Sequence, residues 1–247
     1  MSLINVLIFH RIVKYDNDSW TDVKLCLLES LLANAVKNRK HVVTIDHWRL
    51  NNSGDLALSF DDGYLSDYDI VFPLLKKFDF HATFFVVPEF VGKEGYMKWE
   101  QVKEMSDSGM EIGSHSLSHK YLTALSDQDM IKELQNSKNI IESHISKEVT
   151  SFSCPYGDYS GKVYKFATMV GYKNICNSSP GLSHAKKKVI SRNSINSTTK
   201  TDQLGPILNP DFLTIFKRKA GYFVFSYMKK ILGVNNYLRL RRLMFGS

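Results

Sequence analysis

The sequence predicts a single α/β domain in which parallel strands alternate with helices. Short apolar runs alternate along the chain with longer segments whose apolar residues recur at helical spacing, as in successive βα units. The length of 247 residues also suits one large α/β barrel. Hydrophobic residues make up 43% of the chain, which is ample for a core and argues against a disordered chain.

Each predicted strand is a short apolar run, which is typical of the strands of a parallel sheet. In chain order they cover Val6–Phe9, His41–Ile45, Leu56–Phe60, Ala82–Val87, Met110–Ser114, Thr150–Cys154, Tyr172–Cys176 and Val189–Ser191. Five helices are expected between them, over residues 22–38, 66–78, 99–108, 126–143 and 160–170.

The expected helices carry recognisable end signals. Ser66 with Asp69 three residues later resembles a capping box, and Ser126 with Asp129 opens the longest helix in the same way. Gly171 stands where the last of these helices must stop.

Two adjacent carboxylates, Asp61 and Asp62, follow the strand Leu56–Phe60. Neighbouring residues in a strand point to opposite faces, so both carboxylates can serve one site only if the strand has already ended. Gly63 permits the necessary turn. A solvated Asp-Gly turn is the alternative interpretation.

A pair of histidines, His115 and His119, follows the strand Met110–Ser114. Four residues apart on a helical turn, the two imidazoles would lie on one face, a spacing that suits a divalent metal. The pair is weak evidence alone, because 8 histidines in 247 residues can produce such a spacing by chance. His119 could also simply cap or pack a helix. A third segment, Cys154-Pro155-Tyr156-Gly157, also follows a predicted strand.

The segments SFDDG, HSLSH and PYG, in this order, resemble the motifs of the NodB-homology polysaccharide deacetylases, carbohydrate esterase family four. The resemblance covers about Leu3 to Arg192. It implies a distorted (β/α) barrel of about seven units, in which the carboxyl ends of the strands lie on one face. Six residues that directly follow predicted strands are expected on that face: His10, Asp61, Asp62, His115, Pro155 and Arg192.

By this resemblance, Asp62, His115 and His119 would hold a divalent metal, and Asp61 would be the base that takes a proton from water. The backbone N–H of Tyr156 would stabilise the oxyanion. Zinc is expected because two imidazoles and a carboxylate suit it, with cobalt or nickel as alternatives.

Three residues are expected to contact the substrate: Pro155, Tyr156 and Trp48. Pro155 would also stiffen its loop, because its ring restricts φ.

The chain departs from the family pattern at two places. Many members carry an arginine two positions before the proline, where it braces the catalytic aspartate, but this chain has Ser153. Members also carry a late LxH segment whose histidine donates a proton, and none follows Arg192. VLIFHR resembles a variant whose first strand ends in histidine. This nominates His10 as the acid. Arg192, in the segment VISRNSI, could replace the missing arginine. Ordinary structural roles are the alternatives for both residues.

Three classes of function compete. The first is a deacetylase acting on the N-acetyl group of an amino sugar in a polysaccharide, oligosaccharide or lipid-linked glycan. The second is a catalytically degenerate barrel that binds glycan without turnover, suggested by Ser153. The third is a nucleic-acid binder, suggested by the net charge of +7. The chain has no recognised nucleic-acid motif and its basic residues lie away from the site, so we expect no nucleic-acid partner.

We divide the chain into a catalytic domain, residues 1–205, and a basic-aromatic extension, residues 206–247. In the extension, apolar residues interleave with Lys and Arg, and no Asp or Glu follows Asp211. This composition fits a helix in a membrane interface, with its basic side near anionic headgroups. A barrel-closing helix is the alternative, because Gly221 and Gly233 interrupt any long helix.

The expected location is the cytoplasm, with peripheral contact at the inner face of the membrane. The 3 cysteines form no CxxC pair, which favours a reducing compartment. The amino terminus is interpreted as a strand rather than a signal peptide, because no basic start precedes it. The sequence leaves the sugar, the metal and the oligomeric state open.

Overall fold

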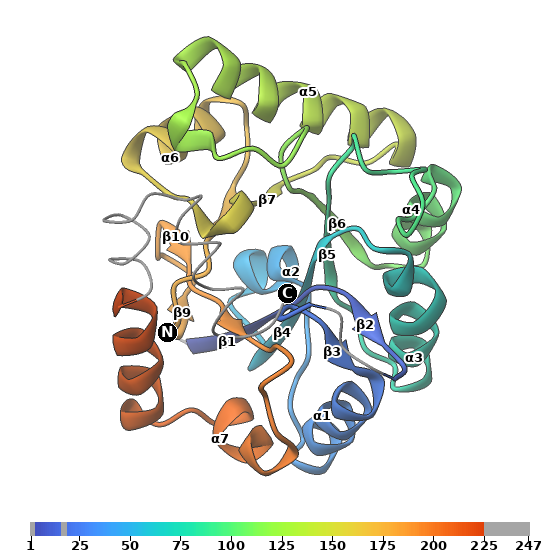
Figure 1. Ribbon diagram of the computed structural model, residues 1–247, viewed down its shortest axis with the longest axis vertical. Helices are drawn as coiled ribbons and strands as arrows, with labels where there is room; N and C mark the ends of the chain where they lie inside the picture. The colour runs from blue at the N-terminus through green and yellow to red at the C-terminus, as the bar shows by residue number, and fades with distance from the viewer. Residues whose placement is uncertain (1–2, 16–18, 225–247) are drawn as a thin grey trace.

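In the computed structural model, which describes residues 3–15 and 19–224, a parallel sheet curls into a nearly closed barrel (Figure 1). Its strands are β1 (Leu3–Phe9), β4 (Leu56–Asp62), β5 (Thr83–Val86), β6 (Glu111–Ser114), β7 (Ser151–Ser153), β8 (Asn174–Cys176), β9 (Ser183–His184), β10 (Val189–Ile190) and β11 (Asn193–Ser194). Their order is β10-β8-β7-β6-β5-β4-β1-β11, and β9 pairs with β1 in antiparallel orientation. A separate pair joins β2 (Ile12–Val13) to β3 (Val23–Lys24).

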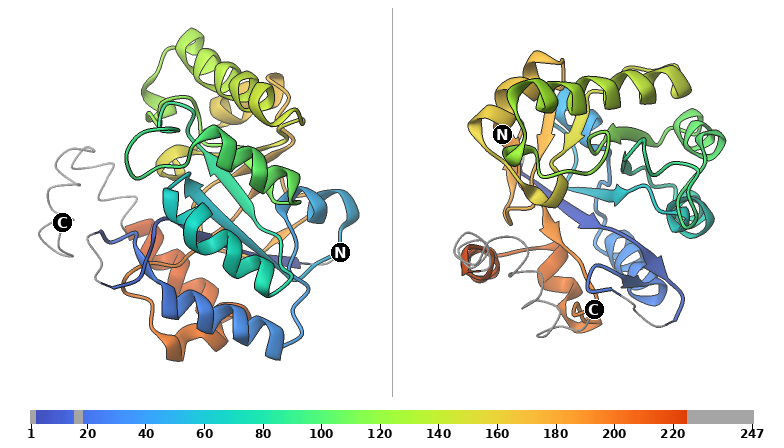
Figure 2. Two further views of the ribbon diagram at one scale, coloured as in Figure 1. Left: turned by 90° about the vertical axis from the view of Figure 1, so that its right-hand side faces the viewer. Right: turned by 45° about the horizontal axis from the view of Figure 1, so that its top comes forward.

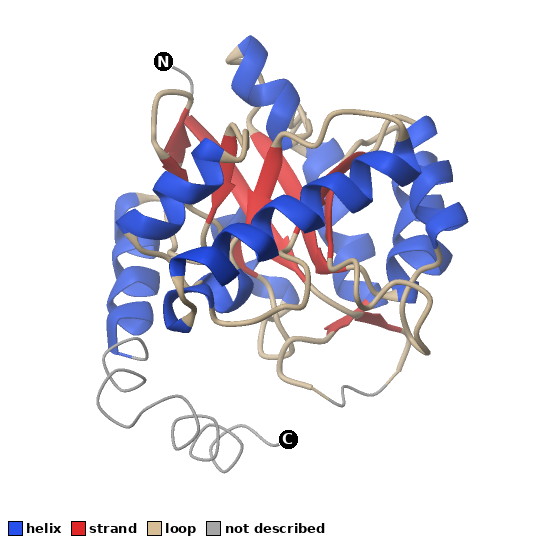
Figure 3. Ribbon diagram, turned by 90° about the horizontal axis from the view of Figure 1, so that it is seen from above, coloured by secondary structure: helices blue, strands red, loops and turns tan. Residues whose placement is uncertain are grey.

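Helices surround the outside of the strands (Figures 2 and 3). They are α1 (Leu25–Lys37), α3 (Phe72–Lys77), α4 (Trp99–Asp107), α5 (Asp127–Ile145), α6 (Gly161–Met169) and α7 (Leu204–Leu208), whereas α2 (Ile45–Asn51) lies within the ring of strands. A π-helical turn, Asp67–Val71, leads into α3, and residues 212–224 are also helical. In the part of the chain that is described, no helix has both the length and the hydropathy needed to cross a membrane. The α/β barrel predicted from the sequence is confirmed.

The strand that carries the two aspartates lies in the middle of the sheet. All seven residues of β4 are buried, and β4 pairs in register with β1 from Asn5↔Leu56 to Phe9↔Phe60. On its other side it pairs with β5, as far as Asp62↔Val86. This register places the carboxyl ends of β1, β4 and β5 side by side, so that the residues following them share one end of the barrel.

The core has two parts, because successive strand residues face opposite sides of the sheet. Leu7 and Phe9 of β1 join the large cluster between the sheet and the surrounding helices. Ile4 and Val6 of the same strand join a smaller cluster with Trp48 of α2. The smaller cluster fills the barrel around α2, which lies within the ring of strands in Figure 1.

Polar contacts hold α2 at the amino ends of the strands. The backbone N–H of Ile45 donates to Thr83 Oγ1 at 3.0 Å, and that of Asp46 donates to Glu111 Oε2 at 3.0 Å. Asp46 Oδ1 in turn accepts from Asn174 Nδ2 at 3.0 Å. Because Thr83, Glu111 and Asn174 begin β5, β6 and β8, α2 closes the end of the barrel opposite to the carboxyl ends.

The strand predicted at His41–Ile45 is therefore wrong. Only an isolated bridge, Val42↔Leu56, forms there, and Thr44 caps α2 by accepting from the N–H of His47. The physical reason is that β4 already has β1 and β5 on its two edges, which leaves no edge for another long strand.

The two expected capping boxes have different outcomes. Ser126 accepts from the backbone N–H of Asp129 at 3.2 Å and caps α5 as predicted. Ser66 caps nothing; its hydroxyl accepts from the N–H of Ile12 at 3.1 Å. Ser66 therefore ties the π-helical turn to β2.

The predicted domain boundary at 205/206 falls inside α7. Ile207 and Leu208 are buried in the large core cluster, and the carbonyl of Ile207 accepts from Asn5 Nδ2 at 2.7 Å. The barrel domain thus continues to the end of α7, and the extension begins after it.

Candidate active site

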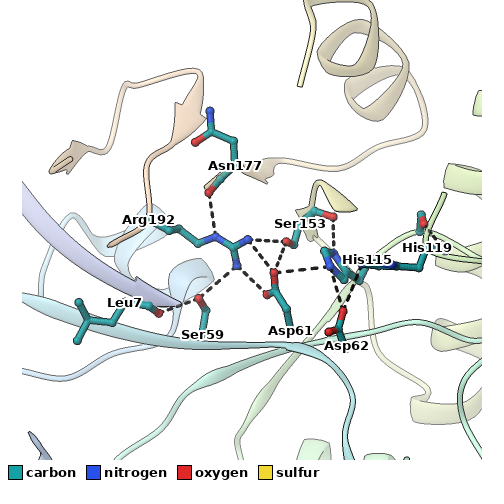
Figure 4. Close-up of polar contacts among 10 residues, drawn as sticks. Leu7, Ser59, Asp61, Asp62, His115, His119, Ser153, Asn177 and Arg192 are labelled. Atoms are coloured by element: carbon teal, nitrogen blue, oxygen red, sulfur yellow. Dashed lines mark hydrogen bonds and ion pairs between the residues drawn. The ribbon is translucent and has the colours of Figure 1, made fainter. Parts of the chain in front are cut away.

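Three side chains meet at the carboxyl end of the barrel in an arrangement that suits a metal ion. Each of Asp62, His115 and His119 offers a ligand atom, and these atoms lie within 4.8 Å of one another (Figure 4). Asp62 Oδ1 is 3.5 Å from His115 Nε2 and 3.3 Å from His119 Nε2. The structure thus brings together the three ligands expected from the sequence.

Asp62 reaches this cluster because the backbone changes conformation at that residue. The ladder with β5 continues to Asp62, yet Asp62 has a φ of 80° and Gly63 a φ of 75°. Left-handed backbone interrupts the alternation of a strand, so adjacent aspartates can serve one site. We expected the strand to end before Asp62, but its pairing continues while its extended geometry does not.

The two histidines are not on a helical turn, and that expectation is wrong. Ser116 and His119 both have left-handed backbone, with φ of 62° and 59°. The buried carboxylate of Glu133, on α5, accepts from the backbone N–H groups of Leu117 and Ser118 at 3.0 Å and 2.9 Å. It also accepts from Ser118 Oγ at 2.5 Å. Glu133, which the sequence did not indicate, thus holds the loop that joins the histidines.

The hydrogen bonds of the cluster fit a cation. His115 Nδ1 lies 2.8 Å from the carbonyl oxygen of Ser153; a carbonyl only accepts, so Nδ1 carries the proton and Nε2 presents a lone pair. Asp62 Oδ1 is buried and has no hydrogen-bond partner among the described residues. A metal ion bound between Asp62 Oδ1 and His115 Nε2 would give the unpartnered carboxylate oxygen a partner.

The third ligand, His119, has an imidazole that stays neutral at ordinary pH. Burial, followed by the charge of His115, lowers the pKa of His119 to about 4, against the opposing effect of Asp62. A neutral imidazole has the free lone pair that a metal requires.

Asp61 lies beside this cluster in a buried ion pair with Arg192. Arg192 Nη1 donates to Asp61 Oδ1 at 2.7 Å and Nη2 donates to Asp61 Oδ2 at 2.8 Å, a two-pronged contact (Figure 4). Burial alone would raise the pKa of Asp61, but Arg192, with His115 and His10, outweighs it and holds that pKa well below its ordinary value. Asp61 is therefore ionised at neutral pH.

Ser153 links Asp61 and Arg192. Its hydroxyl accepts from Arg192 Nη2 at 2.7 Å and donates to Asp61 Oδ2 at 2.9 Å. Arg192 also donates through Nε to the carbonyl of Asn177 at 3.0 Å. The structure therefore brings a guanidinium to Asp61 from the segment after β10, while the serine occupies the position where an arginine was expected.

A sequence model of the family described as polysaccharide deacetylase matches residues 50–175, just over half of the 247 residues. The chain belongs to the polysaccharide deacetylase family. The family expected from the sequence is confirmed. The match includes both aspartates and both histidines, whereas His10 and Arg192 lie outside it.

Two curated relatives illustrate the extent of the likeness. A peptidoglycan-N-acetylglucosamine deacetylase of Bacillus cereus is 32% identical over 126 residues, which are 51% of this chain and 57% of that protein. The peptidoglycan-N-acetylmuramic acid deacetylase PdaC of Bacillus subtilis is 36% identical over 107 residues, 43% of this chain and 22% of that protein. The chain thus spans little more than half of these relatives' length at most.

Solved structures of other deacetylases share the fold of this family member. The Streptococcus pyogenes deacetylase PplD, in complex with acetate, superposes with a TM-score of 0.77 at 22% identity, covering 84% of this chain and 99% of that one. BC0361, a polysaccharide deacetylase from Bacillus cereus, superposes with a TM-score of 0.76 at 23% identity, covering 84% of this chain and 69% of that one.

Of the remaining predicted residues, His10 follows β1 directly at the same end of the barrel. Its Nδ1 is buried and has no hydrogen-bond partner among the described residues. Trp48, by contrast, is fully buried in α2 with the smaller core cluster. The expected substrate contact of Trp48 is therefore wrong, because α2 closes the opposite end of the barrel.

Aromatic rings border the three candidate ligands; Tyr156 was expected at the site from the sequence, whereas Tyr121, Phe90 and Tyr96 were not. Tyr156, half exposed, stacks on Tyr121 with ring centroids 4.0 Å apart and planes 7° apart. Its ring centroid also lies 4.5 Å from that of His119. The ring centroid of Phe90 lies 6.0 Å from that of His119 and 4.9 Å from that of Tyr96. Only the fold brings these loops together, so no local sequence signal could have identified Tyr121, Phe90 or Tyr96.

Proposed function

We propose that the protein is a metal-dependent deacetylase that hydrolyses the N-acetyl group of an amino sugar in a polysaccharide, oligosaccharide or lipid-linked glycan. The observation that carries this proposal is the meeting of Asp62, His115 and His119, with the ion pair of Asp61 beside them. The named activities of the two curated relatives, on peptidoglycan N-acetylglucosamine and N-acetylmuramic acid, support the substrate class.

Asp62, His115 and His119 would hold the metal through one carboxylate and two imidazoles. Zinc fits this donor set best, with cobalt or nickel as alternatives. When bound, such an ion lowers the pKa of water toward about 7 and polarises the acetyl oxygen.

Asp61 would take the proton of the attacking water. Its Oδ2 faces the ligand cluster, 3.6 Å from His115 Nε2. The two-pronged contact with Arg192 and the hydroxyl of Ser153 prevent the carboxylate from rotating. This pairing lowers the basicity of Asp61, but it keeps the group ionised and aimed at one point.

His10 would supply the proton that the departing amine needs, because an amide nitrogen leaves poorly as an anion. The backbone N–H of Tyr156 would stabilise the oxyanion. The stacked rings of Tyr156 and Tyr121 offer an apolar surface for the face of a sugar ring.

The alternative, a degenerate barrel that binds glycan without turnover, was suggested by the serine at position 153. Arg192 supplies the guanidinium to Asp61 from a different segment, so the serine no longer favours a degenerate site.

Acetate release from N-acetylglucosamine oligomers, peptidoglycan fragments and lipid-linked amino sugars, each with and without chelator, tests the proposal. We expect release from one of these classes and its loss on chelation. Asp61→Asn should abolish turnover and keep the metal.

His115→Ala and His119→Ala should lose both the bound metal and the activity. Metal content is measured by mass spectrometry, with the exposed His47→Ala as the matched control. Wild-type metal content in both ligand variants would refute the site. The cytoplasmic location expected from the sequence stays a prediction, which cell fractionation can test.

A further inference from the structure

The helix at residues 212–224 turns an apolar side to the solvent. Five large apolar side chains on it are more than half exposed: Phe212 (85%), Leu213 (55%), Phe216 (58%), Phe223 (64%) and Val224 (58%). At 3.6 residues per turn, these positions and Ala220 fall within about 120° on one side of the helix. We call this apolar side the outer face. A helix on a protein surface ordinarily turns its polar side to the solvent, so the polarity of this helix is the reverse of the usual one.

The opposite side of the helix packs on the barrel near the active site. Lys219, at one margin of the outer face, reaches back to the barrel: its Cε lies 3.4 Å from the point that a Cβ on Gly181, in the loop after β8, would occupy. Burial, followed by the charge of Asp158, raises the pKa of the partly buried Tyr222, so Tyr222 lies near the loop that follows β7. Gly181 lies just before β9, which pairs with the first residues of β1, so it is Tyr222, near the carboxyl end of β7, that brings the last turns of the helix toward the active-site end. In Figure 1 the helix lies beside β9.

The charges around the outer face select an anionic partner. Lys217 and Lys219 are exposed, and the helical spacing puts them at the two margins of the apolar side. Residues 212–247 contain eight of the 32 Lys and Arg and none of the 25 Asp and Glu. The rest of the chain therefore has 24 basic against 25 acidic residues, and the whole positive excess of the protein lies in this segment.

We propose that the outer face docks on an anionic lipid surface, with its phenylalanines among the acyl chains and its marginal lysines at the headgroups. A second copy of the chain would bring the same lysines together, and like charges would repel. Residues 225–247 carry five further basic residues and no acid, so they offer nothing to pair with Lys217 and Lys219. An anionic membrane matches both the apolar side and the charge.

Docking in this way would hold the active-site end near the headgroups, where a lipid-linked amino sugar would present its N-acetyl group. This last step rests on the proposed function, whereas the docking itself does not. Asp61→Asn, which removes the proposed base, should therefore bind vesicles as the wild type does.

The experiment is sedimentation of the full-length protein with vesicles of phosphatidylcholine, with or without phosphatidylglycerol, at low and high salt. We expect binding only to the anionic vesicles, weakened by salt. Phe216→Asp/Phe223→Asp should lower the partition coefficient at least about tenfold, because each phenylalanine no longer enters the apolar layer. Leu50→Asp/Met169→Asp, at positions that are 72% and 60% exposed elsewhere, should leave it unchanged.

Lys217→Glu/Lys219→Glu tests the electrostatic part. The partition coefficient should fall at least about 25-fold, because each basic residue near an anionic surface contributes about fivefold and each glutamate adds repulsion. Lys76→Glu/Lys77→Glu, which reverses two exposed lysines on α3, should change it little. Equal vesicle binding by wild type and the Phe216/Phe223 variant would overturn the proposal. So would a dimer in lipid-free solution that this variant dissociates, since the face would then belong to a second copy.

Discussion

At the scale of single residues, Arg192 is the side chain on which the geometry of the site most depends. It is fully buried and donates to Asp61, Ser153, Ser59 and the carbonyl of Asn177. Removing one member of a buried ion pair typically costs about 3–5 kcal/mol of stability. A loss of activity on replacing Arg192 would therefore not separate catalysis from folding, and His10 and Asp67 give sharper tests.

His10→Ala should slow the hydrolysis of an N-acetyl amide by about 100- to 10,000-fold, the usual contribution of a general acid. An activated ester such as p-nitrophenyl acetate should be hydrolysed almost as fast as by the wild type, because its phenolate leaves without protonation. The ratio of the two rates measures the role of His10. An equal loss on both substrates, or full retention of amide hydrolysis, would contradict the assignment of His10 as the acid.

Asp67 is fully buried, and neither of its carboxylate oxygens has a hydrogen-bond partner among the described residues. Burial, then the charges of Asp62 and Asp61, raises the pKa of Asp67 well above its ordinary value. A raised folded-state pKa means that the unfolded chain loses this proton first as the pH rises. The stability of the metal-free protein should therefore fall between the ordinary pKa, about 3.9, and the folded-state pKa.

Asp67→Asn should remove this loss. Relative to the wild type, its free energy of unfolding should grow by up to about 1.4 kcal/mol per pH unit across that window and then stay constant. Denaturant titrations in chelator at a series of pH values measure the difference. A difference that does not change with pH would show that Asp67 is ionised at no cost in the fold.

At the scale of elements, the site depends on the contact between α5 and the loop that carries the histidines. Glu133 accepts from two consecutive backbone N–H groups and from Ser118 Oγ. It reaches the metal ligands only through that loop, so it is a positioning residue.

Glu133→Ala should lower zinc affinity by about 10- to 100-fold, as loss of an outer-shell contact typically does. Glu133→Gln keeps one oxygen that can accept both N–H groups, so it should restore most of the affinity. Competition with a chelator of known affinity gives the measurement, with thermal unfolding of each variant alongside. Wild-type zinc affinity in the alanine variant would exclude the positioning role.

At the scale of the whole molecule, the barrel includes α7, so the place where the chain is cut matters. A chain ending at residue 205 loses Ile207 and Leu208 from the large core cluster, and each such loss costs about 2–5 kcal/mol. A chain ending at residue 209 keeps them. The shorter chain should unfold at a markedly lower temperature, and both lack the helix at 212–224, so the comparison isolates α7. Equal unfolding temperatures would restore the boundary at 205/206.

The sequence by itself determined those features whose cause is local. The apolar runs and helical periodicities identified most strands and helices, because burial of one face produces those patterns. Ser126 indicated the start of α5, because capping involves only neighbouring residues. Asp62, His115 and His119 were nominated by resemblance to the family motifs, because residues within one short motif keep their spacing in the sequence.

Only the tertiary structure decided the features that depend on competition or on distant contacts. The segment at 41–45 lost its strand because both edges of β4 were occupied. The loop between the histidines is left-handed because Glu133, from α5, fixes it. Arg192 meets Asp61 across 131 positions of the chain, and the outer face at 212–224 became visible once the other side packed on the barrel. Such outcomes depend on which surfaces the folded chain leaves free, and a local pattern carries no information about that.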